Sequence, residues 1–364
     1  MPTLSFAKPA EIGFDPTRLT RAFDLLRKWA ETDHVPAAGV CIGRHGKAVE
    51  PVFAGHAKND SLFLVASLSK PVTVTAALIL IERGLMALDD RVATFVPKFA
   101  ANGKKDVRIR HLMTHTSGLP DMPPDDLMLR KEQKPLSAFI DSTCRLPLLF
   151  EPGTKVNYQS MGTAMLGEIV HQVAGVTLPE FLAKELFAPL GMSDSSLGWN
   201  PTKKERILPV RLPPGATTHE IVWNTPYWLG FGAPWGGLIT TPADYARFCL
   251  TMLGGGKLAD ARILSPTTVR AMTSNQLEGM PKMAEEERRC RPWGLGWRLN
   301  WPAHSANFGD LLGPRSFGHW GATGTLAWCD PETDSFAVLL TTQPQEPEGH
   351  FLARLSNAIC AAIV

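Results

Sequence analysis

The chain has 364 residues, 44% of them hydrophobic and 20% charged, and its 37 basic and 35 acidic side chains leave a net charge of +2. A chain of this length forms about two domains or one large one, and it can bury a core that needs no disulfide or metal to support it. The small net charge argues against a nucleic-acid-binding protein, because phosphate contacts require a dense basic surface.

The sequence carries no signal for a membrane or for export. No apolar run reaches the roughly 20 residues that span a bilayer, so no membrane partner is expected. Residues Met1–Lys8 lack the apolar segment of a signal peptide, which predicts a cytoplasmic protein, although a chain whose signal had been removed would look the same. Six isolated cysteines predict free thiols in a reducing compartment, with no disulfide framework and no metal site: Cys41, Cys144, Cys249, Cys290, Cys329 and Cys360.

Hydrophobic periodicity and turn residues predict the elements in chain order. The expected helices lie at residues 16–33, 242–253 and about 349–363, with a helix-rich stretch from about 68 to 190. The expected strands lie at residues 37–44, 49–54, 294–299, 324–329 and 335–341. Residues 198–236 are rich in Pro, Trp and Gly, so they are expected to be irregular.

Strands at both ends of the chain with helices between them predict an α+β fold. We expect one antiparallel sheet built by residues 1–84 and 238–364 and flanked by the N- and C-terminal helices. Residues 85–237 would form an inserted all-helical domain, with the active site between the two units.

Ser67 and Lys70 begin an expected helix over residues 67–84 that is apolar on nearly every face and is therefore predicted to run through a core. The spacing i, i+3 places both side chains on one face of the first turn. A lysine desolvated there can lose its proton and deprotonate the serine. The alternative is a helix N-cap with a surface lysine, since Ser-x-x-Lys is a short pattern that also occurs at Ser5 and Lys8 without an apolar helix.

Other conspicuous residues have structural and functional interpretations. His111 and His115 have the spacing of a two-histidine metal site on an expected helix, but no third ligand accompanies them, so a structural role is expected.

The chain contains no Gly-x-Ser-x-Gly, which argues against an α/β-hydrolase. An aromatic run either packs onto a domain surface or forms a wall of an acyl pocket: Trp223, Tyr227, Trp228, Phe231 and Trp235.

Five sequence blocks, in this order and spacing, resemble the serine β-lactamase and penicillin-binding-protein superfamily. The resemblance is to the class C β-lactamase-like branch, which includes the family VIII esterases, and it spans most of the chain. The blocks are Ala66–Pro71, Ile109–Pro120, Glu151–Tyr158, Trp235–Thr241 and Gly318–Gly324.

The resemblance implies a β-lactamase/transpeptidase-like fold and an acyl-enzyme mechanism without a cofactor. Ser67 would be the acylated nucleophile, and Lys70 its partner base. Tyr158 stands where the family places a catalytic tyrosine, on a loop facing the nucleophile. The backbone N–H groups of Ser67 and Ala322 would form the oxyanion hole.

Two departures from the family pattern bear on the substrate. The family's Tyr-x-Asn reads Tyr158-Gln159-Ser160, and the lysine of Lys-Thr-Gly is replaced in His319-Trp320-Gly321. Both changes weaken recognition of an anionic peptide-like substrate but leave acyl transfer intact, which favours an ester over a lactam. Ser160, Trp320 and Gly321 are expected on the substrate side. His319 is either a substrate contact or a strand histidine with its hydrogen bonds satisfied.

The sequence therefore predicts a serine hydrolase that cleaves small carboxylic esters. One alternative keeps the fold and changes the substrate, giving a β-lactamase, a D-amino-acid peptidase or an acyltransferase. Another is a non-catalytic binding or sensor protein that uses the same pocket. The expected partner is a small-molecule ester or amide, and the chain would be a monomer or a homodimer.

Overall fold

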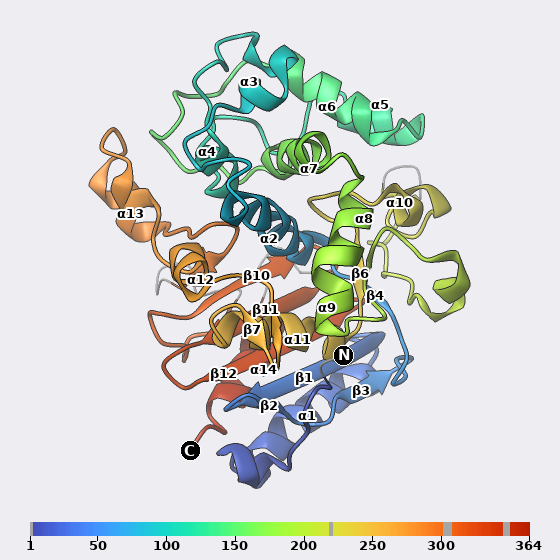
Figure 1. Cartoon of the computed structure of the whole chain (residues 1–364). Coiled ribbons are helices and arrows are strands. Elements are labelled where there is room, and N and C mark those ends of the chain that lie inside the picture. The colour runs from blue at the N-terminus through green and yellow to red at the C-terminus, as the bar shows by residue number, and fades with distance from the viewer. Residues whose placement is uncertain (1–2, 218–220, 301–307, 345–349) are drawn as a thin grey trace.

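The computed structural model describes residues 3–217, 221–300, 308–344 and 350–364, and the fold is α+β (Figure 1). Its main sheet has seven described strands in the order β2-β1-β12-β11-β10-β9, with β3 also paired to β1, and every pairing is antiparallel. The strands are β1 (Ala37–Arg44), β2 (Lys47–Ala48), β3 (Val52–Gly55), β9 (Arg298–Leu299), β10 (Phe317–Gly321), β11 (Thr325–Asp330) and β12 (Ser335–Thr341). The predicted sheet from both ends of the chain is therefore confirmed.

Two predicted strands differ from the structure. The strand expected over residues 49–54 begins only at Val52, as β3, because Pro51 has no N–H to donate to a ladder; β2 ends before it, at Ala48. The strand expected over residues 294–299 shortens to β9. The N–H groups of Leu295 and Gly296 bond instead to the carbonyls of Met272 and Met113, and Gly296 has a left-handed φ of 76° that a strand does not allow.

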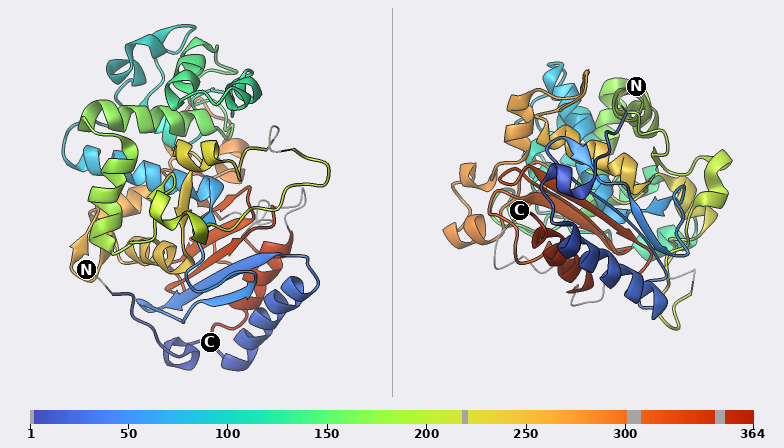
Figure 2. Two further views of the ribbon diagram at one scale, coloured as in Figure 1. Left: turned by 90° about the vertical axis from the view of Figure 1, so that its right-hand side faces the viewer. Right: turned by 90° about the horizontal axis from the view of Figure 1, so that it is seen from below.

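The two faces of the sheet are covered by different helices. Helices α1 (Pro16–Glu31) and α14 (His350–Cys360) lie side by side on one face, as the view from below shows (Figure 2). Helix α11 (Pro242–Leu253) packs on the other face. Strand β12 alternates accordingly: Leu339 belongs to the cluster under α1 and α14, whereas Val338 belongs to the larger cluster that contains α11. This is the two-residue side-chain period of a strand buried on both sides.

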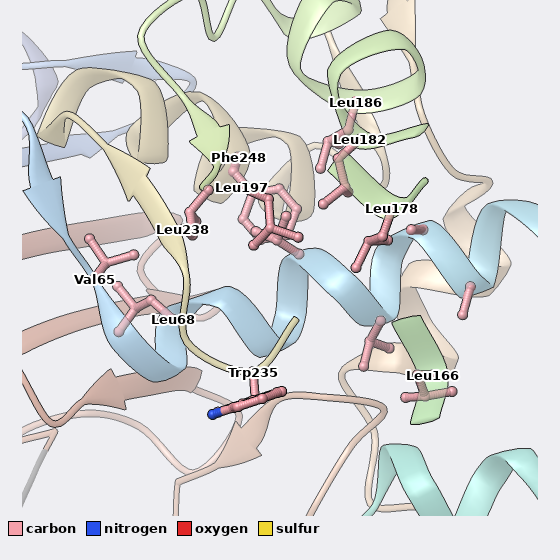
Figure 3. Packing of buried hydrophobic residues seen from close by; sticks show 14 of the residues in the cluster. Val65, Leu68, Leu166, Leu178, Leu182, Leu186, Leu197, Trp235, Leu238 and Phe248 are labelled. Atoms are coloured by element: carbon pink, nitrogen blue, oxygen red, sulfur yellow. The ribbon is translucent and has the colours of Figure 1, made fainter. Parts of the chain in front are cut away.

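Helix α2 (Ser69–Glu82) is the centre of the larger core, and its residues from Ser69 to Leu80 are all buried. Figure 3 shows Leu178 and Phe248 on one side of α2 and Leu166 and Trp235 on the other. A helix surrounded in this way has no polar face to present to water. The sequence prediction that it runs through a core is confirmed.

The remaining elements surround α2: helices α3 to α7 lie above it in Figure 1, and the other helices and the small sheets lie beside and below it. The helices are α3 (Val92–Phe95), α4 (Ile109–Met113), α5 (Asp126–Lys131), α6 (Leu136–Arg145), α7 (Ser160–Ala174), α8 (Leu178–Leu182), α9 (Ala188–Leu190), α10 (Pro226–Phe231), α12 (Pro266–Met272) and α13 (Glu285–Cys290). The short strands are β4 (Phe63–Leu64), β5 (Ser196–Leu197), β6 (Leu238–Thr240), β7 (Lys257–Leu258) and β8 (Ala261–Arg262). The division into residues 1–84 with 238–364 and residues 85–237 stays a prediction; α2, at the end of the first segment, packs against α7 and α8 of the second.

All six cysteines carry free thiols. Within the described ranges, no group of three or more His, Cys, Asp and Glu side chains is arranged to hold a metal ion. Of the helices in the described part of the chain, none is long and apolar enough to cross a membrane.

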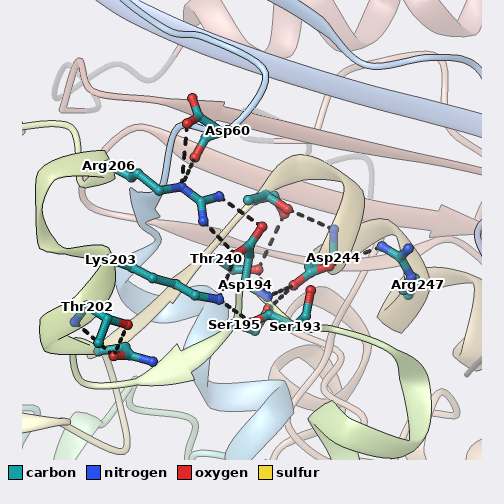
Figure 4. A network of polar contacts seen from close by, with 12 residues as sticks. Asp60, Ser193, Asp194, Ser195, Thr202, Lys203, Arg206, Thr240, Asp244 and Arg247 are labelled. Carbon is teal, nitrogen blue, oxygen red and sulfur yellow. Dashed lines mark hydrogen bonds and ion pairs between the residues drawn. The ribbon is translucent and has the colours of Figure 1, made fainter.

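A polar network fastens the segment between α9 and η5 (Pro201–Arg206) to the N-terminal turn of α11 (Figure 4). The carboxylate of Asp194 accepts hydrogen bonds from both terminal nitrogens of Arg206, at 2.8 and 2.9 Å, and from Lys203 Nζ at 2.7 Å. The Asp194 N–H donates to Asp244 on α11 at 2.8 Å. Mainly through Arg206, the network lowers the pKa of Asp194 from 3.8 to about 2.

We expect Asp194→Asn to lower the free energy of unfolding at pH 7 by about 1 to 2 kcal/mol, a range reduced for the partial exposure of the carboxylate. Because the pKa is lower in the folded state, this stabilisation is present above pH 4 and is lost as the pH falls toward 2. Urea denaturation measures this, and the difference in free energy of unfolding between wild type and Asp194→Asn should be smaller at pH 3 than at pH 6. Asp24→Asn, in an exposed ion pair with Arg27, is the control that should change little.

Candidate active site

Ser67 lies in a strained turn immediately before α2. Ala66 has a left-handed φ of 46°, which costs a residue with a side chain roughly 1 to 3 kcal/mol. The turn is a 3-10 helix over Ala66–Leu68, and α2 begins at Ser69. Ser67 is therefore not the N-cap that the sequence suggested; the N-cap of α2 is Leu68, and the Ser67 side chain is half-buried.

Side chains from distant segments hold this turn in place. Ser69 Oγ donates to the Ala66 carbonyl at 2.6 Å and accepts from the Leu238 N–H at 2.9 Å. Thr325 Oγ1 donates to the Val65 carbonyl at 2.9 Å. These bonds tie the turn to β6 and β11 and stabilise the strained conformation.

Gly321, the last residue of β10, lies directly against the segment that precedes Ser67. A Cβ atom at this position would come 2.2 Å from the Val65 carbonyl oxygen, so only glycine fits. The close approach brings the end of β10, and the exposed Ala322 after it, beside the Ser67 turn.

The ammonium group of Lys70 is buried in the core beside Ser67. Its side chain is 1% exposed, and Nζ lies 2.9 Å from Ser67 Oγ and 3.1 Å from the Trp235 carbonyl oxygen. Burial lowers the pKa of Lys70 from 10.5 to about 7, against a smaller opposing effect of Asp121. The alternative of a surface lysine is wrong, and near pH 7 a large fraction of this amine is neutral.

Tyr158 lies on the loop before α7, with its ring centroid 4.6 Å from Lys70 Nζ. Burial raises the pKa of Tyr158 far above its ordinary value of 10, and the nearby Ser67 side chain only partly offsets this. Within the described residues the phenol oxygen is buried and makes no hydrogen bond of standard geometry. The phenol is therefore protonated and available as a hydrogen-bond donor.

His115 holds the Tyr158 loop from three directions. Its carbonyl accepts from the Asn157 N–H at 2.9 Å, its Nδ1 accepts from the Gln159 N–H at 3.1 Å, and its ring centroid lies 4.7 Å from that of Tyr158. His115 is not on the helix expected from its spacing with His111, because α4 ends at Met113 and His115 has a left-handed φ of 59°. Burial holds the pKa of His115 well below 6.5, so the ring is neutral.

His319 lies on β10 with both ring nitrogens buried. Its Nδ1 is 2.8 Å from the Trp320 carbonyl oxygen, so Nδ1 carries the proton and Nε2 has a free lone pair. No group in the described ranges bonds to Nε2. Burial lowers the pKa of His319 from 6.5 to about 3, so this ring does not supply the charge of the lysine it replaces.

A cavity of about 230 Å³ opens beside these groups. Of the predicted residues, Tyr158, His319 and Trp320 line it. The others are not among its lining residues: Ser67, Lys70, Ser160, Gly321 and Ala322. Ser160 begins α7 and its N–H donates to Asp121 Oδ1 at 2.6 Å. Its assignment to the substrate side stays a prediction.

Sequence reasoning missed other residues of this cavity. Trp293 and Arg298 line it, together with Val156, Asn157, Arg291, Pro292 and Leu299. Neither Trp293 nor Arg298 belongs to a motif. Arg298 is placed by the pairing of β9 with β10, and Trp293, bridged to Arg298, packs with its ring centroid 4.2 Å from that of His115. The aromatic run at residues 223–235 packs instead against the helical core, where Phe231 meets Phe139 with ring centroids 5.2 Å apart.

A serine beside a buried lysine, between an antiparallel sheet and a helical layer, is the arrangement of a serine-hydrolase-type fold. A sequence model of the Beta-lactamase family matches residues 23–360, and the chain belongs to that family. The resemblance to the serine β-lactamase and penicillin-binding-protein superfamily is thereby confirmed.

Individual relatives differ in the activities that their names give. A protein of Escherichia coli K12 named "Putative D-alanyl-D-alanine carboxypeptidase" is 26% identical, over 95% of this chain and 87% of its own. A penicillin-binding-protein homologue from Caulobacter crescentus superposes with a TM-score of 0.77 at 22% identity, covering 96% of this chain and 99% of the other. A family VIII carboxylesterase gives a TM-score of 0.77 at 23% identity, covering 95% and 98%. At these identities the solved structures establish the fold.

We expect His115→Leu to lower the free energy of unfolding by about 2 kcal/mol, because the buried Gln159 N–H loses its acceptor and leucine is strained at a positive φ. His115→Asn should cost about half as much, since asparagine tolerates this conformation and offers an oxygen. Chemical denaturation checks both, with the exposed His56→Leu as the control. Equal losses for the two variants would contradict the assigned role of the backbone conformation.

Proposed function

We propose that the chain is a serine hydrolase that cleaves small carboxylic esters through an acyl-enzyme on Ser67. The proposal is supported above all by the 2.9 Å contact between Ser67 Oγ and a lysine that is buried and has a pKa of about 7. A weak hydroxyl nucleophile needs a nearby base that is neutral at the working pH. Lys70 meets both conditions.

Acylation would begin as neutral Lys70 accepts the Ser67 proton while Oγ attacks the ester carbonyl. The oxyanion would be stabilised by the backbone N–H groups of Ser67 and Ala322. As the tetrahedral intermediate collapses, Tyr158 would donate its proton to the leaving alcohol oxygen. The phenol then regains a proton from Lys70, whose Nζ lies 4.6 Å from the ring centroid.

Deacylation would use the same groups in the opposite sense. Lys70 and Tyr158 together would accept a proton from a water molecule that attacks the acyl-enzyme, and Ser67 would recover its proton as the acid leaves. Nucleophile, base and acid are all side chains of this chain, so the proposed route uses no cofactor.

An ester is favoured over a β-lactam or a D-peptide because His319 is neutral and Tyr-x-Asn is incomplete. The family VIII carboxylesterase supports this choice, whereas the name of the Escherichia coli relative supports a D-amino-acid peptidase as the second candidate. An acyltransferase would follow the same acylation and pass the acyl group to an alcohol in place of water.

We expect wild-type protein to hydrolyse p-nitrophenyl butyrate and Ser67→Ala to lose at least about three orders of magnitude in kcat, as removal of a catalytic nucleophile does. The chain provides a matched control in Ser5→Ala, which alters the other Ser-x-x-Lys sequence at an exposed position and should remain active. Release of p-nitrophenol measures all three proteins.

Two outcomes would revise the proposal. Equal activity of wild type and Ser67→Ala would remove Ser67 from the mechanism. Faster turnover of nitrocefin than of any ester would favour the β-lactamase alternative, and a stable adduct without turnover would favour a sensor protein.

The pH dependence of kcat/KM should follow the protonation of Lys70. Because the reactive form is the neutral amine, kcat/KM should rise about tenfold per pH unit below pH 7 and level off above it. The pKa of His319, about 3, lies too low to contribute, and that of Tyr158 lies too high. Initial rates from pH 5.5 to 9, corrected for spontaneous hydrolysis, measure the profile, and a flat profile would argue against Lys70 as the base.

A further inference from the structure

Gln159, the residue that follows Tyr158, is completely buried although its side chain is polar. It is the N-cap of α7, but its side chain makes no cap hydrogen bond. Asp121 fills that role, because its carboxylate accepts from the Ser160 N–H at 2.6 Å and its carbonyl accepts from the Met161 N–H at 3.1 Å. The buried amide of Gln159 is therefore free for a purpose other than beginning the helix.

The Gln159 amide ties the Tyr158 loop to the segment around the end of α4. Its Nε2 donates to the His111 carbonyl oxygen at 3.1 Å, and its Oε1 accepts a hydrogen bond from Ser117 Oγ. A carbonyl only accepts and a hydroxyl can donate, so the two bonds fix which way the amide faces. Gly162 on α7 leaves room for it, since a Cβ atom there would come 2.7 Å from Gln159 Nε2.

The Tyr158 phenol depends on such neighbours for its position. Within the described residues its oxygen makes no hydrogen bond of standard geometry. The ring is placed by its contacts with His115 and Trp320, at centroid distances of 4.7 and 6.4 Å, and by the backbone of the loop. Proton transfer needs the two heavy atoms within hydrogen-bond reach, and a misplacement of about 1 Å can cost about 100-fold in rate.

We propose that Gln159 is a positioning residue, whose amide holds the Tyr158 phenol at the leaving oxygen of the ester. This rests on the proposed function and specifies which alcohols the enzyme can expel. As the bond from the carbonyl carbon to the alcohol oxygen breaks, its electron pair stays on that oxygen, which takes the phenol proton, and Lys70 returns a proton to the phenol. A p-nitrophenolate ion leaves without this proton, whereas an alkoxide needs it.

The test compares ethyl butyrate with p-nitrophenyl butyrate, which form the same butyryl-enzyme on Ser67 and differ only in the leaving group. The measured quantity is the ratio of their kcat/KM values, obtained for both by titrating the butyric acid released. This ratio reports the steps through acylation, and a general loss of active protein cancels from it.

Gln159→Met conserves the length of the side chain and removes both amide bonds. It should lower the ratio of ethyl to p-nitrophenyl butyrate about 10- to 100-fold. Ser117→Ala removes only the bond to Oε1, so it should lower the ratio by a smaller factor, and it carries the same test should Gln159→Met fail to fold. Gln172→Met removes an exposed amide from the same helix and should leave the ratio unchanged.

A second background shows whether Gln159 acts through Tyr158. Tyr158→Phe should itself lower the ratio, and adding Gln159→Met to it should lower the ratio no further, because no phenol proton is left to position. An equal loss in both backgrounds would show that Gln159 acts by another route. An unchanged ratio in the folded Gln159→Met and Ser117→Ala proteins would also overturn the inference, and the proposed function would stand.

Two other results concern the proposed function itself. If Tyr158→Phe leaves the ratio unchanged while Ser67→Ala is inactive, Tyr158 is not the acid for the leaving group, and this inference falls while the nucleophile stands. If wild type hydrolyses neither ester, the proposed function and this inference fail together.

Discussion

The burial of one ammonium group is the constraint on which the site depends. Removing a lysine from water is costly unless it loses its proton or gains partners. Lys70 has two oxygen partners and lies at the start of a helix that is buried along nearly its whole length. The apolar core around α2 therefore has a chemical role, because it sets the pKa of the amine beside Ser67.

Keeping that geometry requires contacts from many parts of the chain. The Ser67 turn is bonded to β6 through Ser69 and to β11 through Thr325, and Gly321 allows β10 to approach it. Lys70 Nζ donates to the carbonyl of Trp235. The preceding residue, Pro234, is also fixed, because its carbonyl accepts a hydrogen bond from Thr73 Oγ1 on α2. Strain at Ala66 is tolerated because the surrounding structure fixes this turn on several sides.

The groups around the Ser67 hydroxyl are mostly neutral. Burial leaves His115 and His319 without charge and keeps the Tyr158 phenol protonated. In such surroundings a change in the protonation of Lys70 has a large electrostatic effect on its neighbours, because few mobile charges screen it. Arg291 and Arg298 line the cavity together with Tyr158, whereas Ser67 and Lys70 are not among its lining residues.

Local sequence signals were sufficient for several elements and for the proximity of Ser67 and Lys70. Strand β12 and helix α11 have the predicted bounds, because the apolar run of β12 and the Thr241 cap of α11 are short-range properties. The spacing of Ser67 and Lys70 likewise depends only on one turn of helix. These features follow from interactions between residues that are close in the sequence.

Only the tertiary structure decided what surrounds that pair. The left-handed Ala66, the His115 contacts to the Tyr158 loop and the entry of Trp293 and Arg298 into the cavity leave no periodic or compositional trace. The strand expected at residues 294–299 is shorter than predicted, because the N–H groups of Leu295 and Gly296 find partners far along the chain. The sequence alone determined which groups could react, whereas long-range packing decided their pKa values and the charge that a substrate meets, because both depend on burial and on neighbours distant in sequence.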